Sequence, residues 1–252
     1  MDGITAFMIV RNEAALLPGC LDSLAGAVDA LAVLDTGSTD ATPALVEAAR
    51  DRFRAVRLEH GDLNGGFGPA RARALALVAT PWALWIDADE RLSPALAAEL
   101  RTLRDDGALD AYRLPLRNHV LGRPMRCRQL AGQAPVRLLR TSAAAIDDAA
   151  VHEAVTGVPP HRIGRLLHPL DHLAMTDWRA YLRKVDRYTT LEAATSARPF
   201  RLWHLLVTGP ATFLQQYLRR TAIRDGWPGF VWAATSAWSA VSRDWKLARR
   251  GR

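Results

Sequence analysis

The sequence predicts an α/β protein in which helices flank a mostly parallel central sheet and a helical extension follows at the C-terminus. Three observations support this fold class. Strand-like apolar runs alternate with helix-like segments through the first half of the chain. The 252 residues, 49% of them hydrophobic and 23% charged, are enough to bury a sizeable core. Basic residues and tryptophans are concentrated in the last 52 residues, which indicates a separate C-terminal part.

The strands expected in the first half are short, mostly apolar runs at residues 4–10, 31–35, 55–58 and 82–86. Helices are expected between them at residues 18–24, 43–50 and 69–78. Each opens with proline, whose missing N–H costs nothing in a first helical turn. Thr42 is expected to cap the helix that starts at Pro43. Ser93-Pro94 is expected to begin another helix that ends near residue 103.

The second half is less regular. Short strands are expected near residues 112–116 and 135–139, and residues 178–194 have a helical pattern. After Pro199 the chain becomes rich in tryptophan and arginine and is again expected to be helical. We therefore expect a catalytic domain over residues 1–200 and a basic, Trp-rich helical extension over residues 201–252.

Cysteine content and hydropathy indicate where in the cell the protein is expected. The two cysteines, Cys20 and Cys127, give no disulfide framework and no Cys-rich metal site, so a reducing cytosol is expected. We expect no signal peptide, because the apolar run at residues 4–10 has no basic leader or cleavage site. No apolar run reaches the roughly 18 residues of a membrane span, so a transmembrane helix is not expected.

The net charge of +7 arises entirely from residues 201–252, which hold nine Lys and Arg but only two Asp and Glu. Five of the eight tryptophans lie there as well. Apolar residues recur at helical spacing at positions 230, 234, 238, 241 and 245, and basic residues follow at positions 243, 246, 249 and 250. This pattern is typical of a helix on an anionic membrane face, and equally of one that packs on the catalytic domain. A peripheral location on the inner face of the cytoplasmic membrane is expected. No nucleic-acid motif accompanies the basic residues, so a nucleic-acid partner is not expected.

Asp87 and Asp89 follow the apolar run Trp82–Ile86 and form a D-x-D motif. In an extended segment side chains at i and i+2 project to the same side. Two carboxylates on one side, with open coordination positions, suit Mg²⁺ or Mn²⁺ shared with substrate phosphates. The alternative is that both acids only solvate the strand end and cap the next turn.

Two further loops are expected at the same edge of the sheet, because the strands before them are parallel. One carries Arg11-Asn12-Glu13, which makes Glu13 a candidate for donor binding, and the other runs from Asp35 to Asp40. Asp35 could accept a hydrogen bond from a nucleotide base or ribose, or it could cap its own turn. Neither G-x-G-x-x-G after the first strand nor a P-loop is present, which disfavours NAD and P-loop-bound ATP.

Taken in order, these motifs resemble family 2 glycosyltransferases, which have the nucleotide-diphospho-sugar (GT-A) fold. The motifs that carry the resemblance in the first half are Val10–Glu13, Leu34–Thr42, Phe67–Arg71 and Ile86–Glu90. Those in the second half resemble the branch that includes the lipopolysaccharide inner-core β-1,4-glucosyltransferases, and they are Val151–Glu153, Pro169–His172, Lys184–Tyr188, Phe213–Arg220 and Arg224–Phe230. The ordered set covers nearly the whole chain.

The resemblance implies a role for each matching residue. Asp35 contacts the donor base, Arg71 lies near the base or the diphosphate, and Asp87 contacts the ribose or the metal. Asp89 ligates the metal, and His172 is a further metal or phosphate contact.

Glu153 is implied as the general base of an inverting transfer. His152 precedes it, and in an extended segment only one of the two faces the site. The alternatives are a surface acid for Glu153 and a structural histidine for His172. Ala72 stands where many relatives have asparagine, so that contact is absent here.

The function expected from these observations is that of an inverting, metal-dependent glycosyltransferase of lipopolysaccharide biosynthesis. It would use a UDP-sugar or another nucleotide-diphosphate donor and a lipid-linked or cell-envelope saccharide acceptor. One alternative is a sugar-1-phosphate nucleotidyltransferase, which the loop at residues 11–14 disfavours because it lacks glycine. The other is a non-catalytic nucleotide-sugar-binding module, which has no physical need for the three acids Asp87, Asp89 and Glu153.

Overall fold

The computed structural model describes residues 3–147, 154–179, 181–182, 185–186, 189–190 and 204–250. The chain forms two compact units: unit 1 is Met1–Leu116 with Gln133–His172, and unit 2 is Arg117–Gly132 with Leu173–Arg252. Each has its own hydrophobic core. The boundary expected near residue 200 falls in 191–203, outside the described residues, and stays a prediction.

Unit 1 is built on a seven-stranded sheet of order β12-β6-β9-β4-β1-β2-β3. The parallel strands are β1 (Ile4–Val10), β2 (Ala30–Asp35), β3 (Ala55–His60) and β4 (Trp82–Trp85). The others are β6 (Ala111–Arg113), β9 (Val136–Arg140), antiparallel to both β4 and β6, and β12 (Ile163–Arg165), parallel to β6. Parallel strands dominate this mixed sheet, which confirms the predicted fold class.

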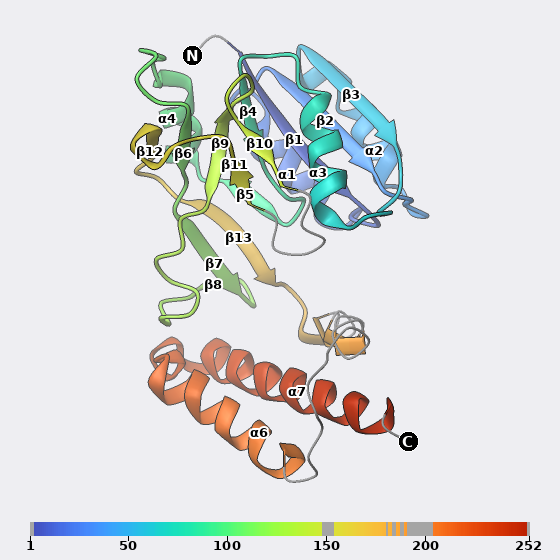
Figure 1. Ribbon diagram of the computed structural model, residues 1–252, viewed down its shortest axis with the longest axis vertical. Helices are drawn as coiled ribbons and strands as arrows, with labels where there is room; N and C mark the ends of the chain where they lie inside the picture. The colour runs from blue at the N-terminus through green and yellow to red at the C-terminus, as the bar shows by residue number, and fades with distance from the viewer. Residues whose placement is uncertain are drawn as a thin grey trace. The chain divides into compact units, whose positions relative to one another are not determined.

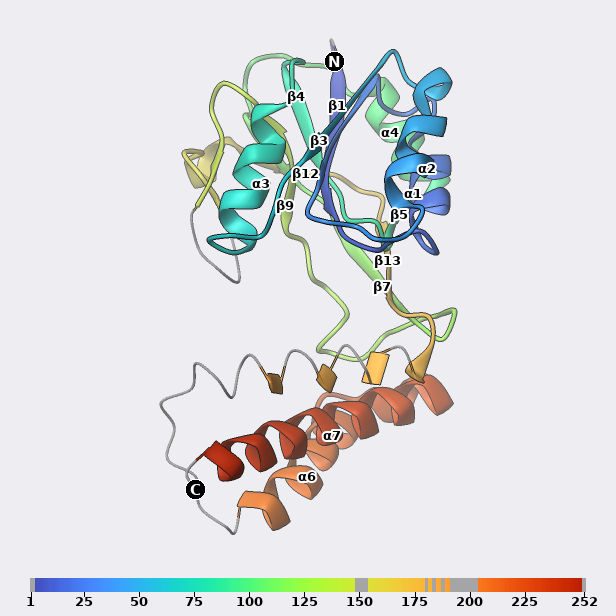
Figure 2. The same cartoon turned by 90° about the vertical axis from the view of Figure 1, so that its right-hand side faces the viewer.

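Helices cover both faces of this sheet, as Figure 1 and Figure 2 show. Helices α1 (Leu17–Leu24), α2 (Thr42–Ala48) and α4 (Pro94–Thr102) lie on one face, and α3 (Phe67–Ala76) lies on the other. Because side chains alternate along a strand, Met8 of β1 packs into the core on the first face and Phe7 into the core on the second. The central strands are therefore apolar on both sides, as is expected for a covered parallel sheet.

Short elements complete unit 1. They are the 3-10 turns Arg50–Arg52 and Pro160–Arg162 and the antiparallel pair β10 (Ala145–Ile146) and β11 (Val155–Thr156). In addition, β5 (Glu90–Leu92) pairs antiparallel with the first half, residues 170–172, of β13 (Leu170–Met175). Ser93 caps α4, since its hydroxyl accepts the Leu96 N–H at 3.2 Å. The predicted cap at Thr42 was wrong, because α2 begins at Thr42 itself. The Asp40 carboxylate accepts the Thr42 N–H at 2.9 Å instead.

Unit 2 contains a short hairpin and, among its described residues, the helices α6 (His204–Leu214) and α7 (Gly226–Arg250) together with helical positions between 178 and 190. Its further elements are β7 (Leu116–Val120), β8 (Arg123–Pro124), a π-helical segment (Gln215–Arg219) and a 3-10 turn (Ala222–Asp225). Helices α6 and α7 lie side by side (Figure 1). The described positions between 178 and 190 are helical, as predicted. None of the helices described is both long and apolar enough to cross a membrane.

The segment Arg117–Gly132 belongs to unit 2 because long-range hydrogen bonds tie it to the C-terminal part of the chain. Asp225 accepts the N–H groups of Arg126 and Cys127, both at 2.9 Å. Arg128 donates its N–H to the carbonyl of Arg220 at 2.9 Å. These contacts join residues about a hundred positions apart in the sequence.

Candidate active site

Two loops at the carboxyl edge of the sheet, after β1 and β2, are joined by hydrogen bonds. Asn12 Oδ1 accepts the Thr39 N–H at 2.7 Å, and the Asn12 N–H donates to the Ser38 hydroxyl at 3.0 Å. Asn12 has a φ of 57°, a left-handed conformation that asparagine adopts more readily than most residues. The Thr42 hydroxyl accepts the Glu13 N–H at 2.8 Å. These hydrogen bonds fix the two loops relative to each other. The role of Glu13 in donor binding stays a prediction.

Asp35 ends β2 and is 1% exposed. Its Oδ1 accepts the backbone N–H groups of Gly37 at 3.0 Å and Ser38 at 2.8 Å. Its Oδ2 lies 3.7 Å from Nδ1 of His60. The carboxylate therefore does cap its turn, and Oδ2 is the oxygen that takes no part in the cap. A contact between Asp35 and a nucleotide base stays a prediction.

Asp87 lies just beyond β4 and is held by two arginines. Arg71 of α3 donates to Asp87 Oδ1 at 2.7 Å, and Nη2 of Arg137 lies 3.5 Å from Oδ2. Both guanidinium groups lie over the ring of Trp85, with Cζ 4.5 Å and 4.8 Å from its centroid, which cation–π attraction favours. Burial opposes ionisation of Asp87, but Arg71 and Arg137 outweigh it and lower the pKa of this carboxyl. Asp87 is therefore held as a carboxylate.

Glu90 and Arg137 form a buried ion pair beside Asp87 that was not predicted. Arg137 Nη2 donates to Glu90 Oε1 at 2.7 Å, and Glu90 Oε2 accepts the Asp87 N–H at 2.9 Å. Arg137 is 9% exposed and Glu90 is 1% exposed. Burial raises the pKa of Glu90, and Arg137 acts against that rise. The signal in the sequence was an arginine inside the apolar run of residues 136–139, since charged side chains are rarely buried without a partner.

A β-bulge brings Arg137 to this position. Tyr112 of β6 pairs with Leu138 and Arg113 pairs with Val136, so Arg137 is the extra residue of β9. Bulges re-aim side chains and are frequent beside active sites. Nε and Nη1 of Arg137 are buried and have no hydrogen-bond partner among the described residues. Buried donors without a partner are rare in proteins, so this arginine has donors to spare.

Asp89 faces a histidine from a different strand. His172 of β13 pairs in register with Glu90 of β5, and its Nε2 lies 3.5 Å from Asp89 Oδ2. Burial acts to lower the pKa of His172, but the hydrogen bond to Asp89 and the nearby Glu90 and Asp87 raise it overall. The structure therefore brings four predicted site residues together beyond the end of β4, namely Arg71, Asp87, Asp89 and His172.

The relation between Asp87 and Asp89 differs from the one expected. Strand β4 ends at Trp85, and Ala88 and Asp89 lie in a turn. Alternation along a strand therefore does not govern the pair: Asp87 turns to the arginines and Asp89 to His172. Both acids still act electrostatically on His172, so they remain in one cluster.

The fit of this cluster to a divalent cation follows from its charges and donors. Asp87 and Glu90 pair with two arginines and Asp89 faces His172, which leaves one negative charge when the acids and arginines are ionised and His172 is neutral, as a metal ligand is. Across the described ranges, no three His, Cys, Asp or Glu side chains converge as a metal site. Asp89 and His172 offer two ligands, and Mg²⁺ or Mn²⁺ commonly takes its others from water and substrate phosphates. The residues present fit such an ion.

Glu153, the predicted general base, and His152 lie outside the described residues. The role of Glu153 therefore stays a prediction. The nearest described strand is β11, which starts at Val155 and pairs with β10.

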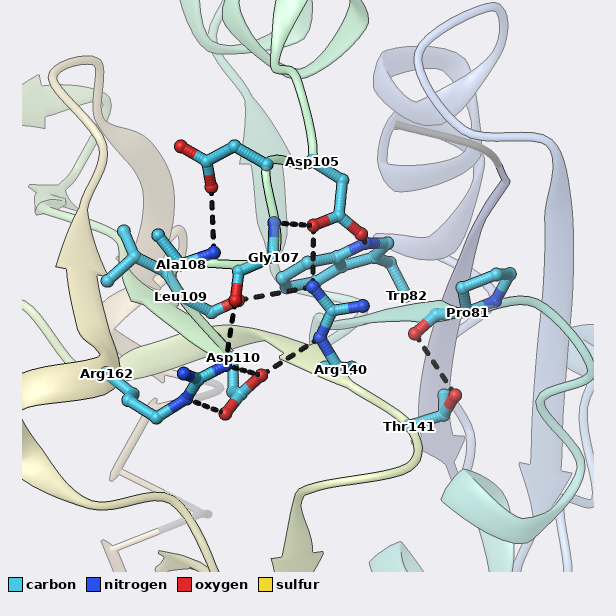
Figure 3. Close-up of polar contacts among 11 residues, drawn as sticks. Pro81, Trp82, Asp105, Gly107, Ala108, Leu109, Asp110, Arg140, Thr141 and Arg162 are labelled. Carbon is cyan, nitrogen blue, oxygen red and sulfur yellow. Dashed lines mark hydrogen bonds and ion pairs between the residues drawn. The ribbon is translucent and has the colours of Figure 1, made fainter.

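The amino-terminal end of β4 carries a second cluster of arginines and acids around a tryptophan (Figure 3). Arg140 Cζ lies 4.7 Å from the centroid of the Trp82 ring. Arg140 donates to Asp105 at 2.6 Å and to Asp110 at 3.0 Å. Asp105 also accepts the Trp82 indole N–H at 3.0 Å, and Arg162 pairs with Asp110. Two arginines pair with two aspartates, so the charges in this cluster balance. We call a cluster with balanced charges closed.

Comparison with known proteins identifies the class of enzyme. The model of the family "Glycosyl transferase family 2" matches residues 5–143. The lipopolysaccharide core biosynthesis glycosyltransferase LpsC of Rhizobium meliloti (strain 1021) is 31% identical, over 98% of this chain and 92% of that protein. The chain belongs to glycosyl transferase family 2, and the protein is a glycosyltransferase.

Solved structures show the fold. S. aureus TarS 1–349 in complex with UDP-GlcNAc superposes with a TM-score of 0.51 at 13% identity, over 99% of this chain and 92% of that one. The mannosyltransferase PcManGT of Pyrobaculum calidifontis, in complex with GDP-Man and Mn²⁺, gives a TM-score of 0.51 at 13% identity, over 100% of this chain and 88% of that one. The fold is GT-A, as the resemblance implied.

Proposed function

We propose that the protein transfers a sugar, with inversion, from a nucleotide-diphosphate donor to a lipid-linked or cell-envelope saccharide, and that it needs a divalent cation. The observation that carries the proposal is the cluster at the end of β4, where Asp87 and Glu90 pair with Arg71 and Arg137 and Asp89 pairs with His172. In α/β proteins ligands bind beyond the carboxyl ends of parallel strands. This cluster lies there, has spare N–H donors on Arg137, and has a surplus negative charge when Glu90 is ionised and His172 is neutral.

Each group has a distinct role in the proposal. Asp89 and His172 would hold Mg²⁺ or Mn²⁺, which supplies positive charge to the leaving diphosphate. Arg71 and Arg137 keep Asp87 ionised and aligned, so that it can accept hydrogen bonds from the donor ribose. Asp35 is proposed to receive the base.

Inverting transfer needs one base on the side of the sugar opposite the leaving group. The acceptor hydroxyl oxygen bonds to the anomeric carbon as the bond from that carbon to the diphosphate oxygen breaks. The hydroxyl proton passes to a carboxylate, and we assign that role to Glu153. The nucleoside diphosphate leaves with the bonding electrons.

The likenesses support the choice of donor and acceptor. One structural neighbour was solved with UDP-GlcNAc and another with GDP-Man and Mn²⁺, and UDP is the donor nucleotide that we propose. LpsC acts in lipopolysaccharide core biosynthesis, and a lipopolysaccharide core saccharide is the acceptor that we propose. Such an acceptor lies at a membrane, and the basic residues 201–252 are proposed to hold the enzyme on the cytoplasmic face. Each basic residue near an anionic surface contributes about 1 kcal/mol.

The proposal is tested by measuring UDP release from UDP-sugars with a lipopolysaccharide core acceptor, with and without Mn²⁺. We expect release that needs acceptor and metal, that is lost in Glu153→Gln, and that is unchanged in Asp106→Asn. Asp106 is a suitable control because it is exposed and its carboxylate accepts the Ala108 N–H at 3.0 Å, in the loop before β6. Release of pyrophosphate from a nucleoside triphosphate would instead identify a nucleotidyltransferase.

A further inference from the structure

Unit 2 contains an open groove of about 510 Å³ along α7, which we call the α7 groove. Its aromatic walls are Trp178, Trp227, Phe230 and Trp238, and Leu182 and Thr235 are also part of the lining. The volume lies in the range of roughly 300–1,000 Å³ of small-molecule sites. All of these lining residues belong to unit 2, so the groove is a feature of that unit alone.

The chemistry of the α7 groove selects an apolar ligand. Among the described lining residues, Thr235 is the one polar side chain other than the tryptophans. Its hydroxyl donates within its own helix, to the carbonyls of Val231 at 2.8 Å and Trp232 at 3.1 Å. Apart from the indole N–H groups of the three tryptophans, the remaining side-chain surface is hydrocarbon and aromatic ring. A sugar or nucleotide would lose more hydrogen bonds to water than these donors replace, whereas a hydrocarbon chain has none to lose.

The aromatic side chains of the groove are unusually exposed. Trp227 is 67% exposed, Trp238 55%, Trp178 47% and Phe230 40%. In unit 1, by contrast, both tryptophans are buried. A contiguous exposed apolar patch of this kind marks a binding surface, while scattered exposed residues do not.

The net charge of unit 2 indicates the charge of the headgroup that would accompany an apolar chain in the α7 groove. The sequence of unit 2 holds 18 Lys and Arg and 5 Asp and Glu, whereas that of unit 1 holds 15 and 21, so the units carry net charges of +13 and −6. At the groove itself, Arg179 Cζ lies 5.4 Å from the centroid of the Trp178 ring. Further along α7, Arg249 lies 5.9 Å from the ring of Trp245. The complementary ligand therefore has an anionic head and an apolar tail.

We infer that the α7 groove binds the acyl chain of an anionic membrane lipid, with arginines such as Arg179 at the headgroup. This deepens the membrane association in the proposed function, on which it rests for its biological purpose. It adds a defined hydrocarbon site, and it extends the lipid contact to Trp178 and Leu182, outside residues 201–252. A helix with Trp and Phe on its apolar face and basic residues on its polar face is typical of membrane interfaces.

The test uses vesicles of phosphatidylglycerol whose acyl chains are brominated, because bromine quenches tryptophan fluorescence at contact. We expect strong quenching of the full-length protein, and weaker binding to neutral phosphatidylcholine vesicles. The double variant Trp227→Ala/Trp238→Ala is expected to partition about tenfold more weakly or worse, since each substitution removes a large apolar side chain from the contact.

A matched control keeps the test specific. Leu214→Ala/Leu218→Ala removes two side chains that are each 52% exposed on the same unit but lie outside the groove, and its partition is expected to stay within about twofold of the parent. Equal losses in both double variants would overturn the inference. So would vesicle binding without quenching, competition by soluble glycerol phosphate, or self-association of the parent that the groove variant abolishes.

Calorimetric titration with UDP and Mn²⁺ on the same preparations separates the two proposals. If UDP binds but lipid chains do not, the groove inference fails alone. If lipid chains bind but UDP does not, the proposed transferase donor fails alone.

Discussion

The two ends of strand β4 carry the same kinds of residue, but only at the amino-terminal end do the charges of these residues balance. At both ends arginines pair with carboxylates beside a tryptophan, with one guanidinium group over the ring of Trp82 and two over the ring of Trp85. At the amino-terminal end two arginines face two aspartates, and the indole N–H of Trp82 has a partner. At the carboxyl end two arginines pair with Asp87 and Glu90, and a third carboxylate, that of Asp89, faces His172. There the indole N–H of Trp85 and two N–H groups of Arg137 have no partner among the described residues.

This difference separates a structural cluster from the binding site that we propose. A closed, neutral cluster has nothing left to offer a ligand, so its contribution is to stability. Buried donors without a partner cost stability in the free protein, and so does the surplus carboxylate charge whenever Glu90 is ionised and His172 is neutral; both are retained where a ligand supplies the missing partners. A metal ion and a diphosphate supply both. The carboxyl end is also the end where the fold places ligands.

The largest effect should come from Asp89. We expect Asp89→Asn to lower kcat/KM of sugar transfer by about a thousandfold, because it removes a carboxylate from the metal ligands. Melting temperature should change little. Asp105→Asn at the other end of β4 is the matched change, and it should do the reverse by lowering the melting temperature and leaving the rate unaltered. Equal rate losses in the two variants would erase the distinction between the ends.

Arg137 should matter for both turnover and stability. Arg137→Met leaves Glu90 buried without its cationic partner, which costs about 3–5 kcal/mol, and it should also slow transfer by about a hundredfold. Adding Glu90→Gln removes the unpaired charge, so the double variant should regain most of the melting temperature but not the rate. Recovery of the rate along with the stability would show that Arg137 acts only as a structural residue.

His172 is expected to tune metal affinity. We expect His172→Ala to raise the Mn²⁺ concentration needed for half-maximal activity by about tenfold to a hundredfold, with the maximal rate approached at high metal. A metal titration of the initial rate measures this. An unchanged Mn²⁺ requirement would remove His172 from the proposed ligands.

The smallest expected effect lies at the closed end. Arg140→Ala should lower the melting temperature by roughly 2–4 °C, because it removes the partner of Asp105 and the cation over Trp82. It should leave kcat/KM unchanged. A loss of transfer activity in this variant would contradict the structural assignment of the cluster.

The stabilising effect of Arg140 should depend on pH in a defined direction. The hydrogen bond from Arg140, acting against burial, lowers the pKa of Asp105 from 3.8 to about 2. A lowered pKa in the folded state means that the stabilisation is present above the unfolded pKa and is lost as pH falls through the folded one. The melting temperatures of the parent and Arg140→Ala should therefore converge as pH falls from about 4 towards 2.

The sequence was sufficient for the core of the fold and for part of the site. Strand β1 lies where its apolar run predicted, at Ile4–Val10, because a strand covered on both faces is apolar throughout. The D-x-D motif at Asp87 and Asp89 was visible because two acids directly follow such a run. The roles of these acids are still predictions, as is that of Glu153.

What sequence reasoning missed depends on long-range geometry. Arg137 reaches the site through a bulge in β9, and a bulge depends on strand pairing that no local pattern specifies. Residues 117–132 are joined to the rest of unit 2 by a hydrogen bond from the Arg126 N–H to Asp225, which is about a hundred residues further along the chain. The predicted cap at Thr42 was wrong, because the Thr42 hydroxyl accepts the N–H of Glu13 in the loop after β1.

The most direct test of the central claim is a calorimetric titration of the protein with UDP, in the presence and absence of Mn²⁺. The account predicts UDP binding that requires Mn²⁺ and that disappears in Asp89→Asn, while Asp105→Asn binds like the parent. UDP binding of equal affinity without metal and in Asp89→Asn would contradict it.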